Sequence, residues 1–350
     1  MKKFFAAANT ENGFFCLFDE VFTPEKFRRI YILKGGPGTG KSTLMLRIGK
    51  AAEEKGYDVE YICCSSDPDS LDGILIDGLS VAVLDGTSPH ITDPVYPGAV
   101  ERIVNLGEAF DFHLLEEKRS DLLPLLQAKK DSYRTAYRFL SAAGRIEKEN
   151  DELMRSFYLA DKANAAVKRL IATFRNKGNG EVRNRYISAI CGKGIYRLDT
   201  LTAQANKIYA VTDKNGSGYL FMDTLYENLC AERFALTVCR SPVTGERTEV
   251  IFLEEERILF TVADDRELLV ADKVINSMRF VDKEKMAQKR QRLRFIEKCK
   301  SAVLDGAASC FEEAAVFHKE AERLYGACID FAKVTAMMKK IISEIFANNV

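Results

Sequence analysis

Apolar positions in the first hundred residues change between strand-like and helix-like spacing. Short apolar runs that are typical of strands cover residues 4–8, 14–18, 30–33, 59–63 and 79–84. A turn at residues 11–13 joins the first two. After the third run, apolar side chains follow helical spacing until Gly56 (Leu44, Ile48, Ala51 and Ala52). Strands that alternate with helices predict an α/β fold with a mostly parallel sheet and helices outside it.

From Asp121 onward the spacing becomes helical. Two stripes, within residues 153–174 and 317–345, advance by alternating steps of four and three, and each has an upstream partner, within residues 122–140 and 286–303. We therefore predict two long helical hairpins with narrow seams, with Pro124 and Gly144 as interruptions or ends. The hairpins either form a lever or partner-binding arm or, as we favour, pack together and join two halves as an internal pseudo-dimer.

The chain also repeats itself, at an offset of 178 residues that takes Ile30 to Ile208. Residues 29–33 are echoed by residues 207–211, and similar echoes lie upstream and downstream. A repeat of this length indicates a duplicated domain. The predicted units are a core at residues 1–112, a hairpin at 113–180, a second core at 181–280 and a second hairpin at 281–350.

Residues 35–42 read Gly-Gly-Pro-Gly-Thr-Gly-Lys-Ser, which is a phosphate-binding P-loop between an apolar strand and a helix. Glycines let backbone N–H groups turn toward an anion, and the helix N-terminus adds partial positive charge. Lys41 is predicted to contact the β- and γ-phosphates and Ser42 to coordinate Mg²⁺. The predicted nucleotide-binding residues are Gly35, Gly36, Pro37, Gly38, Thr39, Gly40, Lys41, Ser42 and Thr43.

Asp85 is the candidate for the second metal-binding residue. It ends an apolar strand, which would place its carboxylate beside the phosphates and Mg²⁺. The alternative is an ordinary turn at Asp85 and Gly86. Nearby His90 either contacts phosphate or base or is a structural loop histidine.

Asp67 and Asp69 are the candidate catalytic carboxylates. They follow the strand predicted at residues 59–63, which we expect beside the P-loop strand. From there either could orient an attacking water or deprotonate an acceptor hydroxyl. The alternative is an Asp-Pro turn in which Ser70 caps a following helix.

The second copy lacks this chemistry. At the offset of 178 residues, Tyr219 stands opposite the P-loop lysine and Leu220 opposite the serine, while Asp213 replaces the first glycine. A negative charge then lies where an anion would bind. We predict that residues 182–280 keep the fold without tight Mg²⁺-nucleotide binding, which leaves one competent site.

The amino-acid composition limits the expected partners and cellular location. Lys plus Arg and Asp plus Glu both total 51 in this 350-residue chain, so the net charge gives no general argument for binding to nucleic acid or membranes. No apolar stretch approaches a bilayer span, and the apolar start is too short for a signal peptide. Nine cysteines without a Cys-x-x-Cys pair disfavour structural zinc and a disulfide framework, so a cytoplasmic location is expected.

The run at residues 34–43, together with residues 67–72 and 88–90, resembles a family of uncharacterised bacterial P-loop ATPase-like proteins. The resemblance covers essentially the whole chain and implies two tandem P-loop-like halves with helical extensions, and ATP binding at residues 35–43. The loop is also similar to that of RecA-type ATPases, which carry a catalytic glutamate after the neighbouring strand. Asp67 stands near that place, a departure that bears on the rate of hydrolysis.

Three functions fit these observations. We predict a Mg²⁺-dependent nucleoside triphosphatase, with ATP as its nucleotide, in which Asp67 or Asp69 acts on water. The first alternative is a small-molecule or nucleotide kinase, with a lid formed by the helical segment that carries Arg134, Arg138 and Arg145. The second is a non-enzymatic switch, in which nucleotide binding repositions the hairpins for a partner protein.

Overall fold

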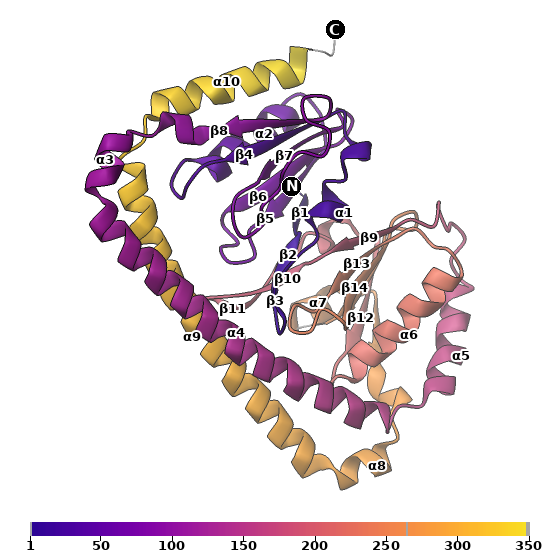
Figure 1. Cartoon of the computed structure of the whole chain (residues 1–350). Coiled ribbons are helices and arrows are strands. Elements are labelled where there is room, and N and C mark those ends of the chain that lie inside the picture. Colours follow the sequence, from indigo (N-terminus) through magenta and orange to yellow (C-terminus); the bar gives the residue numbers. More distant parts are fainter. Residues whose placement is uncertain (1, 264, 348–350) are drawn as a thin grey trace.

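The computed structural model describes residues 2–263 and 265–347 and shows two α/β lobes attached to a pair of long helices (Figure 1). The first lobe contains β1 (Lys2–Phe5), β2 (Ala7–Thr10), β3 (Gly13–Cys16), α1 (Phe18–Val21), β4 (Arg29–Lys34), α2 (Lys41–Glu53), β5 (Val59–Cys63), β6 (Leu71–Ile76), β7 (Val81–Asp85) and β8 (Glu101–Asn105). The second repeats the order of the strands and of the helix after the fourth strand, with β9 (Val182–Arg185), β10 (Ser188–Cys191), β11 (Gly194–Arg197), β12 (Lys207–Thr212), α6 (Ser217–Ala231), β13 (Leu236–Arg240), β14 (Thr248–Leu253), β15 (Ile258–Val262), α7 (Asp265–Val270) and β16 (Lys273–Asn276). Three helices follow each lobe: α3 (Phe112–Glu117), α4 (Arg119–Arg155) and α5 (Ala160–Ile171), then α8 (Lys283–Gln288), α9 (Arg290–Gly326) and α10 (Phe331–Ala347).

The two large sheets share one topology. The first has the strand order β1-β5-β6-β7-β4-β8, and the second has the matching order β9-β13-β14-β15-β12-β16. In each sheet one strand, β6 or β14, runs antiparallel to both neighbours, whereas the remaining pairs are parallel. The predicted α/β class with mostly parallel sheets is therefore confirmed, with the refinement that both sheets are mixed.

Strand β6 is absent from the sequence-based prediction because Asp72 and Gly73 interrupt its apolar run like loop residues. It lies between β5 and β7, so the neighbours of the P-loop strand β4 are β7 and β8. The expectation that strand 59–63 lies beside the P-loop strand is therefore wrong. Ser70 likewise precedes a strand instead of capping a helix.

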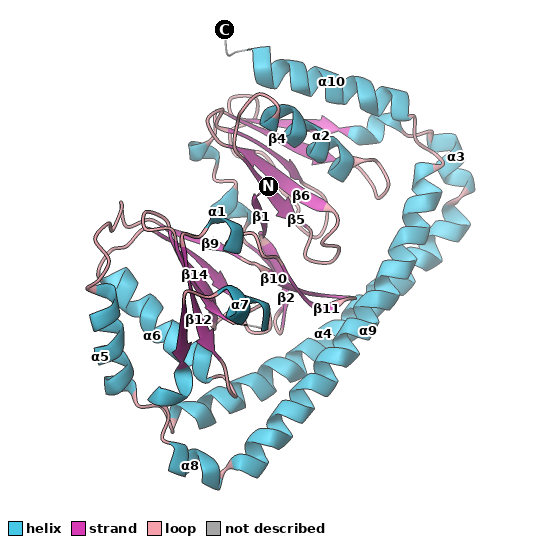
Figure 2. Cartoon of the chain, turned by 180° about the vertical axis from the view of Figure 1, so that it is seen from behind, coloured by secondary structure: helices cyan, strands magenta, loops and turns pink. Residues whose placement is uncertain are grey.

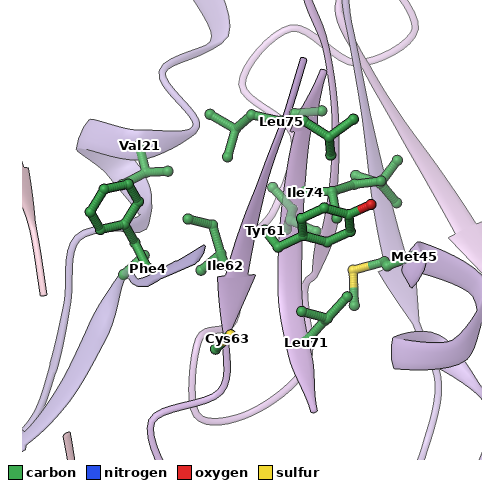
Figure 3. Close-up of a cluster of buried hydrophobic side chains, with 14 of the residues drawn as sticks. Phe4, Val21, Met45, Tyr61, Ile62, Cys63, Leu71, Ile74 and Leu75 are labelled. Carbon is green, nitrogen blue, oxygen red and sulfur yellow. The ribbon is translucent and has the colours of Figure 1, made fainter. Parts of the chain in front are cut away.

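The core of the first lobe lies on both faces of its sheet. Figure 3 shows Met45 and Tyr61 on one side and Phe4, Val21 and Ile62 on the other, and all five are buried. Strands that are covered on both faces need apolar residues at every position. This requirement explains why the central strands appear in the sequence as continuous apolar runs instead of alternating ones.

The long helices do not form the predicted hairpins. Helix α4 runs unbroken for 37 residues, with Pro124 near its start and Gly144 inside it, and α9 has the same length. The two pack antiparallel along their lengths (Figure 2), with Ser132 of α4 donating to Glu313 of α9 at 2.7 Å. Because each long helix pairs with its counterpart from the other half, the hairpin prediction is wrong, whereas the favoured internal pseudo-dimer describes the arrangement.

The last helix of each half covers the lobe of the other half. Helix α10 lies over the first lobe (Figure 1), where Val334, Met338, Ile341 and Ile345 join its core. Helix α5 packs against α6 in the second lobe in the same way. The predicted units at residues 113–180 and 281–350 are therefore not independent, since each closes a core that begins elsewhere in the chain.

A second contact joins the lobes near their first strands. Phe5 and Tyr186 exchange two backbone hydrogen bonds, of 2.8 and 2.9 Å. The two residues hold equivalent places in the repeat, at the carboxyl ends of the first strands: Phe5 is the last residue of β1, and Tyr186 directly follows β9. A reciprocal pair of equivalent residues is what an approximate twofold relation between the halves requires.

Candidate functional site

The glycine-rich loop connects β4 to α2 through residues 35–40. Gly38 and Gly40 have positive φ angles of 71° and 82°, and Gly40 is the N-cap of α2. Only glycine adopts this left-handed conformation without strain. Thr39 steadies the loop by donating from its hydroxyl to the Gly36 carbonyl at 2.9 Å. The expected succession of strand, glycine loop and helix is therefore present.

Lys41 and Asp85 meet at the mouth of this loop. The Lys41 Nζ atom lies 3.6 Å from Asp85 Oδ2 and donates to the carbonyls of Gly35 and Gly36 at 2.9 and 3.0 Å. The second carboxylate oxygen of Asp85 accepts from the backbone and hydroxyl of Thr87. Parallel pairing of β4 with β7 produces this meeting, because it sets Leu33 beside Asp85. The structure thus brings the expected acidic residue to the P-loop lysine.

Ser42 lies next to the start of β6. Its hydroxyl oxygen accepts from the Leu71 backbone at 2.9 Å. The following residue, Asp72, sits at an irregularity in the pairing of β5 with β6, a place where strands commonly redirect a side chain. Asp72 is buried, and its Oδ2 atom has no hydrogen-bond partner among the described residues. This oxygen is therefore able to accept a further hydrogen bond.

His90 lies beside Asp72. Its Nε2 atom lies 3.6 Å from Asp72 Oδ1, and its ring stacks on Phe18 with the centroids 4.7 Å apart. Burial lowers the pKa of His90, but the charges of Asp72 and Asp85 and a hydrogen bond to Asp72 outweigh burial and raise it overall. His90 therefore belongs to the site, next to the carboxylates.

Asp67 and Asp69 lie outside this cluster. Both are exposed, and Asp69 forms an ion pair of 2.8 Å with Lys193 of the second lobe. The hydrogen bond from Lys193 lowers the pKa of Asp69. Since β5 is separated from β4 by two strands, the turn after β5 projects away from the P-loop lysine. Of this acidic segment, Asp72 is the residue that reaches the site, because it lies on β6.

The paired long helices form another wall of the site. Gly38 lies close to α9: a Cβ atom added to this glycine would be only 2.6 Å from the Glu322 carbonyl oxygen. Lys129 of α4 lies 2.9 Å from His318 Nδ1 of α9, and His318 Nε2 lies 3.5 Å from Glu322 Oε1. Burial, with the charges of Lys129 and Lys41, lowers the pKa of His318 to about 4. The histidine is therefore neutral at pH 7.

Sequence reasoning does not identify Lys129 or His318 as site residues. Both occupy polar positions between apolar stripes, which is typical of solvent-facing helix residues. Their place at the P-loop depends on the pairing of α4 with α9, which the pattern does not specify.

The corresponding loop of the second lobe is two residues shorter. Gly216 is a left-handed N-cap like Gly40, but only residues 213–216 separate β12 from α6. The residues that follow the two caps therefore correspond, which sets Ser217 opposite Lys41 and Gly218 opposite Ser42. The pairing of Tyr219 and Leu220 with these positions is wrong, because the shorter loop shifts the alignment.

Charged side chains of the protein itself contact the second loop. The Asp213 carboxylate accepts from the backbone amides of Gly216 and Gly218 at 3.1 and 2.7 Å, so it takes the place of an anion on the loop. Arg247 lies over the Tyr219 ring and pairs with Glu147 and Asp151 of α4. Asp213 within the loop thus supplies an internal anion, and Arg247 beside Gly216 supplies an internal cation. The absence of tight Mg²⁺-nucleotide binding at this loop stays a prediction.

Comparisons with protein-family models, curated proteins and solved structures found no match to this chain. The resemblance to P-loop ATPase-like proteins therefore stays a prediction that rests on the residues themselves. Within the part of the chain that the structure describes, no helix is both long and apolar enough to cross a bilayer.

Proposed function

We propose that this chain binds a nucleoside triphosphate with Mg²⁺, with ATP as the expected nucleotide, and hydrolyses it at one site in the first lobe. The observation that carries the proposal is the approach of Lys41 to Asp85, at 3.6 Å, beside a glycine loop that opens a helix. The loop amides and the lysine supply positive charge for the phosphates, and the carboxylate supplies negative charge for the metal.

The oxygen donors at the loop fit magnesium. Ser42 and Asp85 would hold the ion, and both offer the hard oxygen ligands that Mg²⁺ prefers. When bound, Mg²⁺ neutralises charge on the phosphate oxygens. Lys41 would contact the β- and γ-phosphates, and the remaining loop residues would surround them with backbone amides.

We assign the orientation of the attacking water to Asp72 instead of Asp67 or Asp69. Asp72 is buried near Ser42 and keeps one carboxylate oxygen without a described partner, whereas the other two carboxylates are exposed. His90 beside it could share the proton that water releases.

One observation favours nucleotide-dependent movement as a second function. The loop backbone touches the α9 backbone at Gly38 and Glu322, so a change in loop shape would press directly on the paired helices. No comparable observation favours a kinase. Arg134, Arg138 and Arg145 are exposed on α4, and Arg134 pairs with Asp131 on its own helix.

Phosphate release from a panel of nucleoside triphosphates, with and without Mg²⁺, tests this proposal. Lys41→Ala should lower the Mg²⁺-dependent rate by about 100-fold or more, because it removes the phosphate-facing charge. Lys50→Ala, an exposed lysine on the same helix, is the matched control and should keep the wild-type rate. Equal rates for the two variants, or no release by the wild type, would contradict the proposal.

A further inference from the structure

Lys129 is a half-buried cation that forms no ion pair within the part of the chain that the structure describes. Among the described residues, no carboxylate lies within ion-pair distance of its ammonium group, which contacts His318 Nδ1 at 2.9 Å. Because His318 is neutral, it accepts a hydrogen bond but supplies no negative charge. Burial lowers the pKa of Lys129 and the positive charge of Lys41 adds to this effect, although the more distant Glu322 carboxylate opposes it. A half-buried ammonium group that contacts only a neutral imidazole and, at 5.9 Å, the Tyr133 ring would be stabilised by an anion.

The second half of the chain shows the same position with its charge satisfied. Helices α4 and α9 both span 37 residues, so a residue of α4 corresponds to the residue 171 positions later in α9. Lys300 is the counterpart of Lys129, and Glu147 is the counterpart of His318. Lys300 lies 3.9 Å from Glu147, an acidic partner within the chain. In the half that carries the P-loop, a neutral imidazole takes the place of that acid.

The contacts of His318 lead from Lys129 to the P-loop. With Nδ1 accepting from Lys129, the imidazole carries its proton on Nε2, which lies 3.5 Å from the Glu322 carboxylate. The Glu322 carbonyl in turn lies against Gly38. The lysine is therefore held by α9 at the side of the loop where the helices approach it.

We propose that Lys129 contacts the terminal phosphate of the bound nucleoside triphosphate, so that the paired helices complete the site with a second lysine. The inference rests on the proposed function and adds to it a residue that distinguishes a triphosphate from a diphosphate. The triphosphate supplies the anion that Lys129 lacks within the chain. A cation that stabilises charge on the transferring phosphoryl group also accelerates its transfer.

The test compares Lys129→Met, Lys129→Arg and Lys130→Met with the wild type. Lys130 is the exposed neighbour on the same helix and serves as the matched control. Calorimetric titration with Mg²⁺-ADP and with a non-hydrolysable ATP analogue gives the two affinities, phosphate release gives the rate, and urea unfolding without nucleotide gives the stability.

Lys129→Met should bind the ATP analogue about tenfold more weakly and leave ADP affinity unchanged, because it removes one charge-assisted phosphate contact. Its rate of phosphate release should fall about 100-fold. Its urea midpoint should equal or exceed that of the wild type, because a half-buried charge without an ion-pair partner is removed. Lys129→Arg should keep part of the preference for triphosphate, and Lys130→Met should match the wild type.

Two results would overturn the inference and leave the proposed function standing: an unchanged ratio of the two affinities in Lys129→Met, or a parallel loss of stability and of both affinities. If the wild type bound neither nucleotide, the proposed function would fail and this inference with it.

Discussion

Among individual residues, Gly38 meets two separate demands. Its φ angle of 71° places it in the left-handed region, and its missing side chain leaves room for the Glu322 carbonyl. Gly56 has a similar φ of 83° but no heavy atom within 4 Å of where a Cβ would lie. A substitution at Gly56 would therefore cause backbone strain alone, whereas one at Gly38 would add a steric overlap between the loop and α9.

Gly38→Ala should destabilise the nucleotide-free protein more than Gly56→Ala. Backbone strain alone costs about 1 kcal/mol at either position. The overlap with Glu322 should add about 1–3 kcal/mol at Gly38. Urea unfolding of both variants measures the difference. Equal losses would show that the loop does not rest on α9 as described.

Among the helices, the pairing of α4 with α9 includes a charged layer beside the P-loop. His318 of α9 lies near Lys129 of α4, Lys41 at the start of α2 and Glu322 of its own helix. Burial is the main cause that lowers the pKa of His318, and the two lysines lower it further. The imidazole therefore stays neutral at pH values well below its ordinary pKa. Helix pairing thus sets the protonation state of a side chain at the candidate site.

This layer predicts a pH dependence of stability. An unfolded histidine takes up a proton near its ordinary pKa of about 6.5, whereas folded His318 does so near pH 4. The unfolded state therefore binds more protons between these values, and the contribution of His318 to stability falls as the pH drops from about 6.5 toward 4.

His318→Gln should make that fall shallower, measured as the difference in urea midpoint between pH 7 and pH 4.5. His113→Gln is the control, since the His113 side chain is 86% exposed. If His318→Gln lost stability with pH as steeply as the wild type and the control, the described burial of His318 would be wrong.

In the molecule as a whole, the exchange of α5 and α10 makes the two halves depend on each other. Four apolar side chains of α10 complete the first core: Val334, Met338, Ile341 and Ile345. Burying each contributes roughly 1.5–3 kcal/mol, so together they rival the whole stability of an ordinary domain. The first lobe should not fold without the end of the chain.

Residues 1–178 and 179–350, produced separately, should each lack a cooperative thermal transition as monomers. Produced together, they should associate into a folded complex through α4, α9 and the exchanged helices. Circular dichroism melting and gel filtration measure both outcomes. A folded monomer of residues 1–178 would show that α10 is not needed to close the first core.

Local patterns allowed much of this molecule to be predicted. Two lobes, most central strands and the glycine loop between a strand and a helix follow from spacing along a few residues, because backbone conformation and burial determine the local pattern of apolar residues and glycines. The glycine loop is the clearest case, since its left-handed positions accept few other residues. Asp85 belongs to this group as well, because a buried strand that ends in an acidic residue directs that residue to the edge of the sheet.

The partners of these elements could not be obtained in the same way. Periodicity indicates which face of an element is buried but does not identify the surface that covers it. The pairing of α4 with α9, the insertion of β6 between β5 and β7, and the exchange of α5 and α10 all depend on contacts between segments far apart in the chain. These contacts bring Asp72 and Lys129 to the P-loop and leave Asp67 and Asp69 at the surface, because a site assembled across a fold depends on distances that no local spacing encodes.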